Sequence, residues 1–580
     1  MSPSNPYVYG ELPSRSSFRV LELLPCERSE GQHDIAYRLK FADWEDPPSY
    51  EAISYAWGDP NDVIPTICND GILNITKSLH GALSRFRMKN QTRLLWADAL
   101  CIDQSNLEER RHQVDNMRKI YENAARVLVW LGEDENLHAE RAIEHIAVVS
   151  NAYSVPHYSA STNLWSIVYA SPCPELYPSD SPQLIGSLDW FFSRPWFSRL
   201  WVIQEVNTGQ DVLITCGQHQ IDWLSVAVAA NAFYSMRLSI DVEINCYAAM
   251  NLTEIEFRQD CSAIDLLDIA REFLATDPRD RIYAFLWRPG FAVQCYPVTT
   301  DYSKSIVQTY VDVADAIIRN SGRLDILSHL DLRERIEVPS WVPRWDLAPY
   351  PFKILSNTIS WNANGNTPIS CDIDTNLRSL KASGIRLGSI IEVEMLDSKR
   401  LFLPTVDSDE IRQYRLAFWR EKLPDSDILL QNSILLSYAK VFTCWMGEHV
   451  EIGLLASHFQ DYIGSFRTNK LSRTARHPLE TKTADYSYQE MLAGAKRSSY
   501  ERCFFRVDQG YIGLGPLAMR VGDILCILFG GRVPFILRPN GTHYLFVGEC
   551  YVDGVMFGEA IGKWKAGEFT DTREEIFELH

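Results

Sequence analysis

Short apolar runs alternate with helical patterns over the first third of the chain. Three runs have the length of buried strands: 50–57 (YEAISYAW), 92–98 (TRLLWAD) and 126–131 (RVLVWL). Between the first two runs, Leu79, Leu83 and Phe86 recur at helical spacing and predict a helix over 76–88. This alternation predicts an α/β domain built on a parallel sheet with helices on both faces.

A second helix is predicted before the third run. Ser105 and Glu108 have the spacing of a capping box, in which each side chain bonds the backbone N–H of the other residue. The helix that follows places four residues on one face: Val114, Met117, Tyr121 and Ala124. We therefore expect this helix to pack against the sheet.

Changes of pattern divide the chain into four segments. Phe18–Leu24 and Ala36–Phe41 have strand patterns, Val212–Cys216 is a further buried strand, and Gly530-Gly531 between apolar runs predicts a hairpin. The expected segments are an N-terminal extension with strands (1–46), the α/β domain (47–216) with an insertion at about 133–187, a mainly helical region (217–365), and an α+β, β-rich region (366–580) with an exposed loop at about 464–490.

Composition and charge narrow the class of protein. Hydrophobic residues make up 46% and charged residues 23%, which is typical of a globular protein. The net charge of −19 disfavours nucleic acid and anionic membrane as partners. The 13 cysteines form no CxxC pair, and neither a signal peptide nor an apolar stretch of about 18 residues occurs. We expect a cytoplasmic protein with reduced thiols.

Three long segments stand out together: 50–60 (YEAISYAWGDP), 94–132 (LLWADALCIDQSNLEERRHQVDNMRKIYENAARVLVWLG) and 194–206 (RPWFSRLWVIQEV). They resemble, in the same order, the three signature blocks of the fungal heterokaryon-incompatibility (HET) family. Further family-like blocks are 275–286 (ATDPRDRIYAFL), 338–346 (VPSWVPRWD), 502–516 (RCFFRVDQGYIGLGP) and 547–560 (VGECYVDGVMFGEA). Two small departures are Asp103, where the family often has Asn, and Phe197, where a second Trp is common.

The resemblance implies both a fold and a role. HET domains act in fungal self/nonself discrimination, where their activation triggers cell death, and they resemble TIR domains, whose parallel sheet is flavodoxin-like. The implied partners are further copies of the HET domain, through self-association, and an incompatibility partner protein that the sequence does not identify.

A candidate catalytic residue follows from the same resemblance. Enzymatic TIR domains cleave the nicotinamide–ribose bond of NAD with a Glu that lies four positions after a Trp, and Trp201 and Glu205 have this spacing. NAD would be a consumed substrate, and no cofactor is expected. A carboxylate beside the ribose can stabilise the oxocarbenium-like state, and residues at i and i+4 share one face of a helix. The alternative is a structural carboxylate paired with Arg199 or Arg194.

Candidate binding residues follow the first two strands. The first strand ends with Ser54, Tyr55, Trp57 and Gly58, at the edge where open parallel sheets bind ligands. The alternative is a simple turn, which Asp59-Pro60 indicates. The residues at the end of the second strand are Asp98, Cys101, Asp103 and Gln104. The two aspartates are weak metal candidates, so we expect no metal, and Cys101 fits a buried small residue better than a nucleophile.

Two hypotheses for function therefore stay open. One is an effector that cleaves NAD with Glu205, and the other is a non-enzymatic signalling module that acts by self-association. An aromatic group is interpreted as core in preference to an association surface: Trp190, Phe191, Phe192, Trp196, Phe197 and Trp201. The sequence contains no GxSxG, HExxH or P-loop motif.

Overall fold

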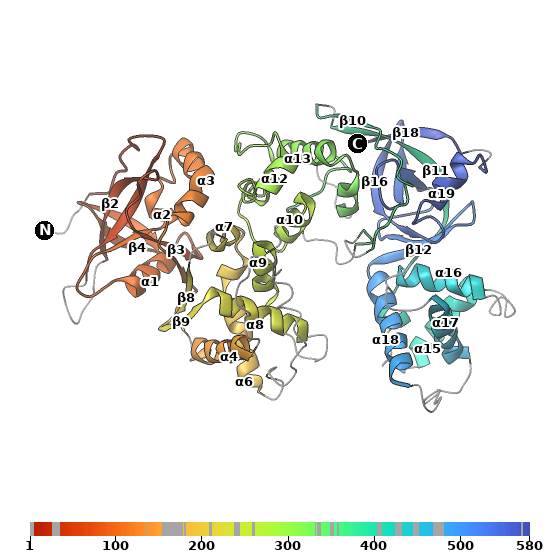
Figure 1. Cartoon of the computed structure of the whole chain (residues 1–580), viewed down its shortest axis with the longest axis horizontal. Helices are drawn as coiled ribbons and strands as arrows, with labels where there is room; N and C mark the ends of the chain where they lie inside the picture. Colours follow the sequence, from red (N-terminus) through yellow and green to blue (C-terminus); the bar gives the residue numbers. More distant parts are fainter. Residues whose placement is uncertain are drawn as a thin grey trace. The chain divides into compact units, whose positions relative to one another are not determined.

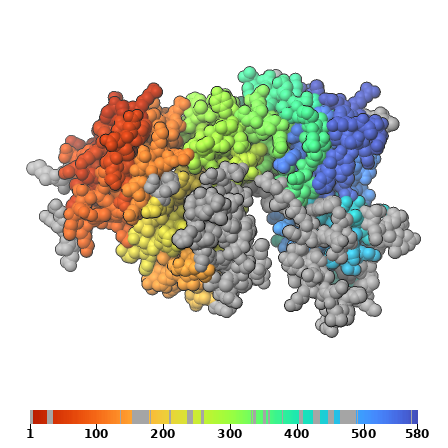
Figure 2. All heavy atoms as spheres, viewed as in Figure 1, coloured from red at the N-terminus to blue at the C-terminus, as the bar shows by residue number. Residues whose placement is uncertain are grey.

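The chain forms two compact units in this computed structural model (Figure 1). Unit 1 comprises Met1–Val293 and Thr299–Lys304, and unit 2 comprises Gln294–Val298 and Ser305–His580. The structure describes all residues except 1–4, 26–34, 135, 153–177, 179–180, 208–210, 237–243, 258–260, 331, 333–337, 348–352, 356–358, 377, 403–408, 424–431, 445–451, 468–480 and 570–571. In the space-filling view of Figure 2, unit 1 runs from red to green and unit 2 from green to blue.

A nine-stranded sheet in the order β5-β4-β2-β1-β6-β3-β7-β8-β9 forms the framework of unit 1. Its strands are β1 (Ser17–Leu23), β2 (Ala36–Asp43), β3 (Glu51–Tyr55), β4 (Val63–Cys68), β5 (Gly71–Thr76), β6 (Arg93–Trp96), β7 (Val127–Trp130), β8 (Val212–Cys216) and β9 (His219–Asp222). Every strand expected in this part of the chain is confirmed. β7 is buried throughout. In β3 the side chains of Ala52, Ile53 and Tyr55 are at most 1% exposed, as expected for a central strand.

The prediction of a parallel sheet is confirmed for the centre of the sheet only, because the sheet as a whole is mixed. The central strands β6, β3, β7 and β8 are parallel to one another. In contrast, β1 runs antiparallel to both β2 and β6, and β9 runs antiparallel to β8. The β4–β5 hairpin was not expected at all. Only two residues of each of these strands are buried, and Pro65 interrupts the strand pattern of β4.

Helices accompany the parallel strands. The expected helices are confirmed as α1 (Lys77–Phe86) and α3 (Leu107–Glu122), with Leu79, Leu83 and Phe86 buried in the first. The predicted capping box at Ser105 is wrong, because Ser105 bonds Asp103 and the N-cap is Asn106, which accepts from the N–H groups of Glu108 and Glu109. A short helix, α2 (Asp98–Cys101), follows β6 directly.

The remaining described helices of unit 1 follow β7 in the sequence. They are α4 (His138–Ala152), α6 (Pro182–Phe192), the 3-10 helix η2 (Pro195–Ser198), α7 (Val202–Val206), α8 (Trp223–Met236), α9 (Tyr247–Phe257), α10 (Ala263–Ala270), α11 (Asp280–Tyr283) and α12 (Pro289–Cys295), the last of which ends in unit 2. Most of the expected insertion at 133–187 lies outside the described residues, and α4 belongs to its described part.

Unit 2 is built on a second sheet that closes on itself. Its order is β14-β15-β16-β18-β11-β12-β13-β17, and β11 also pairs with β14, which joins five strands into a ring. The strands are β10 (Cys371–Asp374), β11 (Ser379–Met395), β12 (Arg502–Val507), β13 (Ile512–Pro516), β14 (Ile524–Leu528), β15 (Phe535–Asn540), β16 (His543–Glu549), β17 (Tyr551–Val552) and β18 (Glu574–Leu579). The hairpin expected at Gly530-Gly531 is confirmed by the antiparallel pairing of β14 with β15.

A group of helices lies between β11 and β12 in the sequence. The helices of unit 2 are α13 (Ile306–Ser321), the 3-10 helix η4 (Asp325–His329), α14 (Ser398–Phe402), α15 (Asp409–Lys422), α16 (Asn432–Thr443), α17 (Ile452–Arg467), α18 (Thr481–Ser498) and α19 (Glu559–Lys565). The loop expected at 464–490 is wrong at both ends, because α17 and α18 occupy 464–467 and 481–490, while 468–480 lies outside the described residues. Among the described residues, no helix combines the length and apolar character needed to span a bilayer.

Candidate functional site

The end of β3 meets α7 through a hydrogen bond between Ser54 and Glu205. The Ser54 hydroxyl donates to Oε2 of Glu205, and the indole Nε1 of Trp196 donates to Ser54 Oγ at 2.6 Å. All three side chains are buried, and Glu205 is only 2% exposed. The structure therefore joins two residues that are 151 positions apart in the sequence, both of which were predicted site residues.

Burial dominates the electrostatics of Glu205. Loss of solvent raises the pKa of its carboxyl to about 7, although Arg199 and the hydrogen bond from Ser54 both oppose this shift. Among the described residues, no Lys or Arg lies within salt-bridge distance of Glu205, so the expected alternative of an ion pair with Arg199 or Arg194 is not realised. Arg199 instead donates to the backbone carbonyl of Tyr55. A buried carboxyl with a perturbed pKa is typical of functional sites.

A second acid lies at the end of β6. The indole Nε1 of Trp57 donates to Oδ2 of Asp98 at 2.7 Å, and the backbone N–H of Ala99 donates to Oδ1 at 2.8 Å. Burial raises the pKa of Asp98, with Arg199 acting in the opposite direction. Burial, followed by the charge of Asp98, also raises the pKa of the Tyr55 hydroxyl. Ser54, Tyr55, Trp57 and Asp98 thus belong to one edge of the sheet, and the Trp57 ring is 39% exposed there.

Gly58 shapes the turn that follows β3. Its φ of +76° is in the left-handed region, where glycine is favoured because it has no Cβ. In the same turn, Asp59 accepts from the backbone N–H of Asn61 at 2.8 Å, which confirms the interpretation of Asp59-Pro60 as a turn. Gly58 therefore has a conformational role in presenting Trp57.

Trp201 and Glu205 have different partners. Trp201 is the N-cap residue of α7, and its indole Nε1 donates to Oδ2 of Asp280 at 3.1 Å. The hydroxyl of Tyr302 donates to the other oxygen of Asp280 at 2.7 Å. The spacing predicted that the indole of Trp201 and the carboxylate of Glu205 share one helix face, but the two groups have no hydrogen-bond partner in common among the described residues.

The remaining predicted residues hold the loop after β6. Cys101 is 1% exposed, and burial raises the pKa of its thiol to about 12, so it is the small buried residue that was expected. Asp103 accepts from Ser105, and Gln104 donates to the backbone carbonyl of Asp98 at 3.0 Å. A buried ion pair between Arg19 and Glu109, at 2.5 Å, fixes the same loop, because Arg19 donates to Cys101 O and Glu109 accepts from Asp103 N.

Known proteins match both ends of this chain. The profile of the heterokaryon incompatibility protein (HET) family matches residues 50–205, which span β3 to α7 and hence both Ser54 and Glu205. The profile of the Het-6 beta-barrel domain matches residues 439–570 of unit 2. Heterokaryon incompatibility protein 6, OR allele, of Neurospora crassa is 23% identical over 93% of this chain and 94% of its own length. The chain belongs to the HET domain proteins. No solved structure matches it.

The sequence did not indicate two polar contacts of the HET domain. Trp196, which was predicted only as a member of an aromatic group, donates to Ser54. Asp280 accepts from Trp201 and Tyr302. Trp196 and Asp280 lie within the family-like blocks 194–206 and 275–286. Their place in these blocks is the sequence feature that could have indicated a role for them. The core interpretation of the aromatic group fits the burial of four members: Phe191, Phe192, Trp196 and Phe197.

One group of carboxylates in this HET domain protein has metal-ligand spacing among the described residues. Oxygens of Glu392, Glu394 and Glu421 lie within 4.8 Å of one another in unit 2. The ammonium group of Lys422 contacts all three, at 3.1 Å in the case of Glu421. A protein cation thus fills the position that a metal ion would take.

Proposed function

We propose that this protein is an effector of fungal heterokaryon incompatibility, acting in self/nonself recognition and programmed cell death. The match of the HET profile to residues 50–205 and the full-length similarity to heterokaryon incompatibility protein 6 support this role. The proposed setting is the cytoplasm, with an incompatibility partner protein as the trigger.

We further propose that the HET domain has a TIR-like fold and cleaves NAD. The observation that carries this proposal is the buried Ser54–Glu205 contact at the end of a central parallel strand. In the reaction the bond between ribose C1′ and the nicotinamide nitrogen breaks, and the electron pair leaves with nicotinamide. Water then attacks C1′ and releases one proton to solvent. The ionised Glu205 would stabilise the positive charge that develops on the ribose, and Trp57 would cover the site.

A matched pair of variants tests this activity. The full-length protein, concentrated to promote assembly, should release nicotinamide from NAD, and Glu205→Gln should abolish release because the amide cannot supply a negative charge. Glu108→Gln, an exposed glutamate of the HET domain, should leave the rate unchanged. Absence of nicotinamide release by wild-type protein at every concentration would reject NAD cleavage while leaving the incompatibility role intact.

The closure of the site favours a second candidate function. Glu205 is 2% exposed, whereas the Trp57 indole is partly exposed on the same edge of the sheet. A signalling module that self-associates through this edge would need Trp57 and not the charge of Glu205. It predicts that Glu205→Gln still kills a fungal host on expression, whereas Trp57→Ala does not. NAD cleavage predicts that Glu205→Gln is harmless.

A further inference from the structure

Unit 2 contains a pocket that the proposed function does not use. It has a volume of about 500 Å³ and lies where the helices α15 and α16 meet strands β12 and β13. This volume is within the range of small-molecule sites, which is about 300–1,000 Å³. The lining residues are Lys422, Leu423, Ile434, Ser437, Tyr438, Arg506, Gly510, Tyr511, Ile512 and Asp553.

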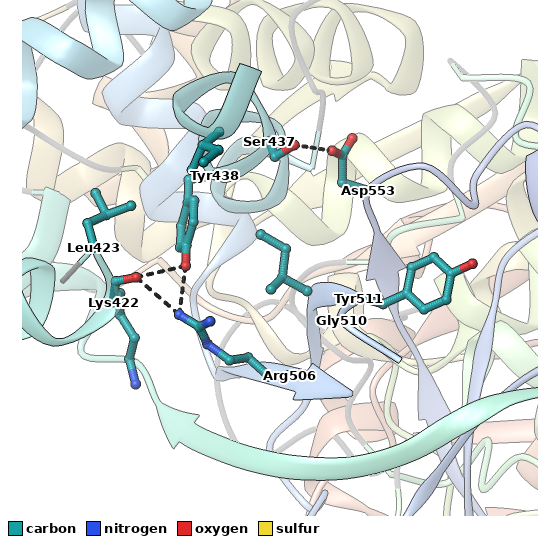
Figure 3. Close-up of a pocket in the computed structure, with 10 residues that line it drawn as sticks. Lys422, Leu423, Ser437, Tyr438, Arg506, Gly510, Tyr511 and Asp553 are labelled. Carbon is teal, nitrogen blue, oxygen red and sulfur yellow. Dashed lines mark hydrogen bonds between the residues drawn. The ribbon is translucent and has the colours of Figure 1, made fainter. Parts of the chain in front are cut away.

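One wall of the pocket is a closed hydrogen-bond triangle. The Tyr438 hydroxyl donates to the Lys422 carbonyl at 2.9 Å, and Nη2 of Arg506 donates to both of these oxygens, at 2.8 and 3.0 Å. Figure 3 shows these three groups gathered on one side, with the Lys422 ammonium directed away from them. Among the described residues, Nη1 of Arg506 makes no hydrogen bond, so one donor of this wall is unused. Tyr438 is 4% exposed, so its side chain is packed on the other sides.

A second wall carries an acceptor. Oδ2 of Asp553 accepts from the Ser437 hydroxyl at 2.6 Å, and this pair lies apart from the triangle in Figure 3. Oδ1 of Asp553 lies 3.7 Å from the Lys440 ammonium, which is beyond hydrogen-bond distance. Within the described part of unit 2, this oxygen therefore has unused capacity as an acceptor. The surfaces of Leu423, Ile434 and Ile512 add apolar area to the pocket.

The charges at both walls are already compensated. Glu392 lies 3.0 Å from Nε of Arg506, and Lys440 faces Asp553. A phosphate or carboxylate ligand would have to compete with Glu392 for Arg506 and would meet the negative charge of Asp553. A compensated, largely apolar pocket with one free donor and one free acceptor favours an uncharged ligand, because burying a charge without a new partner is costly.

We infer that this pocket binds a small, uncharged, mainly apolar molecule that carries a hydrogen-bond donor for Asp553 and an acceptor for Arg506. Its walls come from the helical group between β11 and β12 and from the strands that follow, so the ligand would tie these two parts of unit 2 together. An aromatic hydroxyamide belongs to this chemical class.

The test measures binding of 4-hydroxybenzanilide to the full-length protein by saturation-transfer NMR. We expect a dissociation constant on the order of 0.1–1 mM for a molecule of this size. The charged comparison probes are 4-carboxybenzanilide, in which a carboxylate replaces the hydroxyl, and phenylalanine, a zwitterion. The carboxylate analogue should bind at least about tenfold more weakly, because it cannot donate a hydrogen bond to Asp553 and is repelled by it. Phenylalanine should also bind at least about tenfold more weakly, because both of its charges have to be desolvated.

Two variants locate the binding site. Asp553→Asn keeps the shape of the wall and should weaken the binding of 4-hydroxybenzanilide by about tenfold. Asp372→Asn, at an exposed position of β10, should have no effect. Ile434→Trp fills the pocket and should remove binding while the thermal unfolding of the protein is retained. Tighter binding of either charged probe, equal binding to wild type and Ile434→Trp, or no binding of the neutral probe at millimolar concentration would each overturn the inference.

Discussion

Glu205 in unit 1 and Lys422 in unit 2 are both buried ionisable side chains, but their surroundings have opposite effects on the charged form. Three carboxylates contact the Lys422 ammonium, and together they outweigh the effect of burial and raise its pKa. Among the described residues, Glu205 accepts one hydrogen bond, from Ser54, and lies near one cation, Arg199, and these do not offset burial. The folded protein thus favours the charged form of Lys422 and the neutral form of Glu205.

The difference separates a structural charge from a functional candidate. A fully compensated charge joins parts of the fold, and Lys422 joins the end of α15 to strand β11 through Glu392 and Glu394. An undercompensated charge destabilises the fold, so its presence has to be explained by something other than stability. Glu205 fits this description, and this is the physical reason for proposing it as the catalytic residue of the HET domain.

Removing the compensated charge should have the largest effect. Lys422→Met leaves three carboxylates close together without their cation, and we expect a loss of about 3 kcal/mol in the free energy of unfolding, at the lower end for such pairs because the carboxylates are partly exposed. Denaturant unfolding of the full chain measures this loss. Lys399→Met, at an exposed lysine of α14, should change little, and an equal effect of the two variants would contradict the comparison.

Neutralising Glu205 should increase the free energy of unfolding at neutral and higher pH, which is the opposite of the effect at Lys422. Between its usual pKa of 4.5 and its folded value of about 7, the folded protein holds a proton that the unfolded chain has released, so stability falls as the pH rises through this window. The full loss is about 3 kcal/mol. Glu205→Gln lacks this loss, and we expect it to be as stable as wild type near pH 4.5 and more stable by about 1–3 kcal/mol at pH 8.

The measurement is the difference in unfolding free energy between wild type and Glu205→Gln at several pH values. This difference isolates Glu205 from the other titrating groups. Glu108→Gln, at an exposed position, should show no such pH-dependent difference. A variant that is less stable than wild type at pH 8 would show that the ionised carboxylate stabilises the fold, and the contrast with Lys422 would then fail.

Sequence patterns predicted the positions of the strands better than the order and direction in which the strands pair. Apolar runs located β3, β6 and β7, because central strands bury both faces. The direction of β1 relative to β6 depends on contacts between distant segments, which no local pattern encodes. Ser54 and Glu205 were found through the resemblance to a family, whereas the bonds from Trp196 to Ser54 and from Trp201 to Asp280 depend on tertiary packing.

The smallest expected effect comes from removing the one cation near Glu205. Arg199 lowers the pKa of Glu205, and burial of Arg199 itself is outweighed by Glu205 and Asp98, which raise the pKa of its guanidinium. Arg199→Gln should therefore raise the upper end of the pH window in which Glu205 costs stability by about one pH unit, equivalent to about 1.4 kcal/mol, while the lower end stays at the pKa of the unfolded chain. The unfolding free energy of Arg199→Gln, compared with the double variant Arg199→Gln/Glu205→Gln across pH 5–9, gives the position of that window. An unchanged window would mean that Arg199 acts only through its bond to the Tyr55 carbonyl, and that Glu205 is held by burial and Ser54 alone.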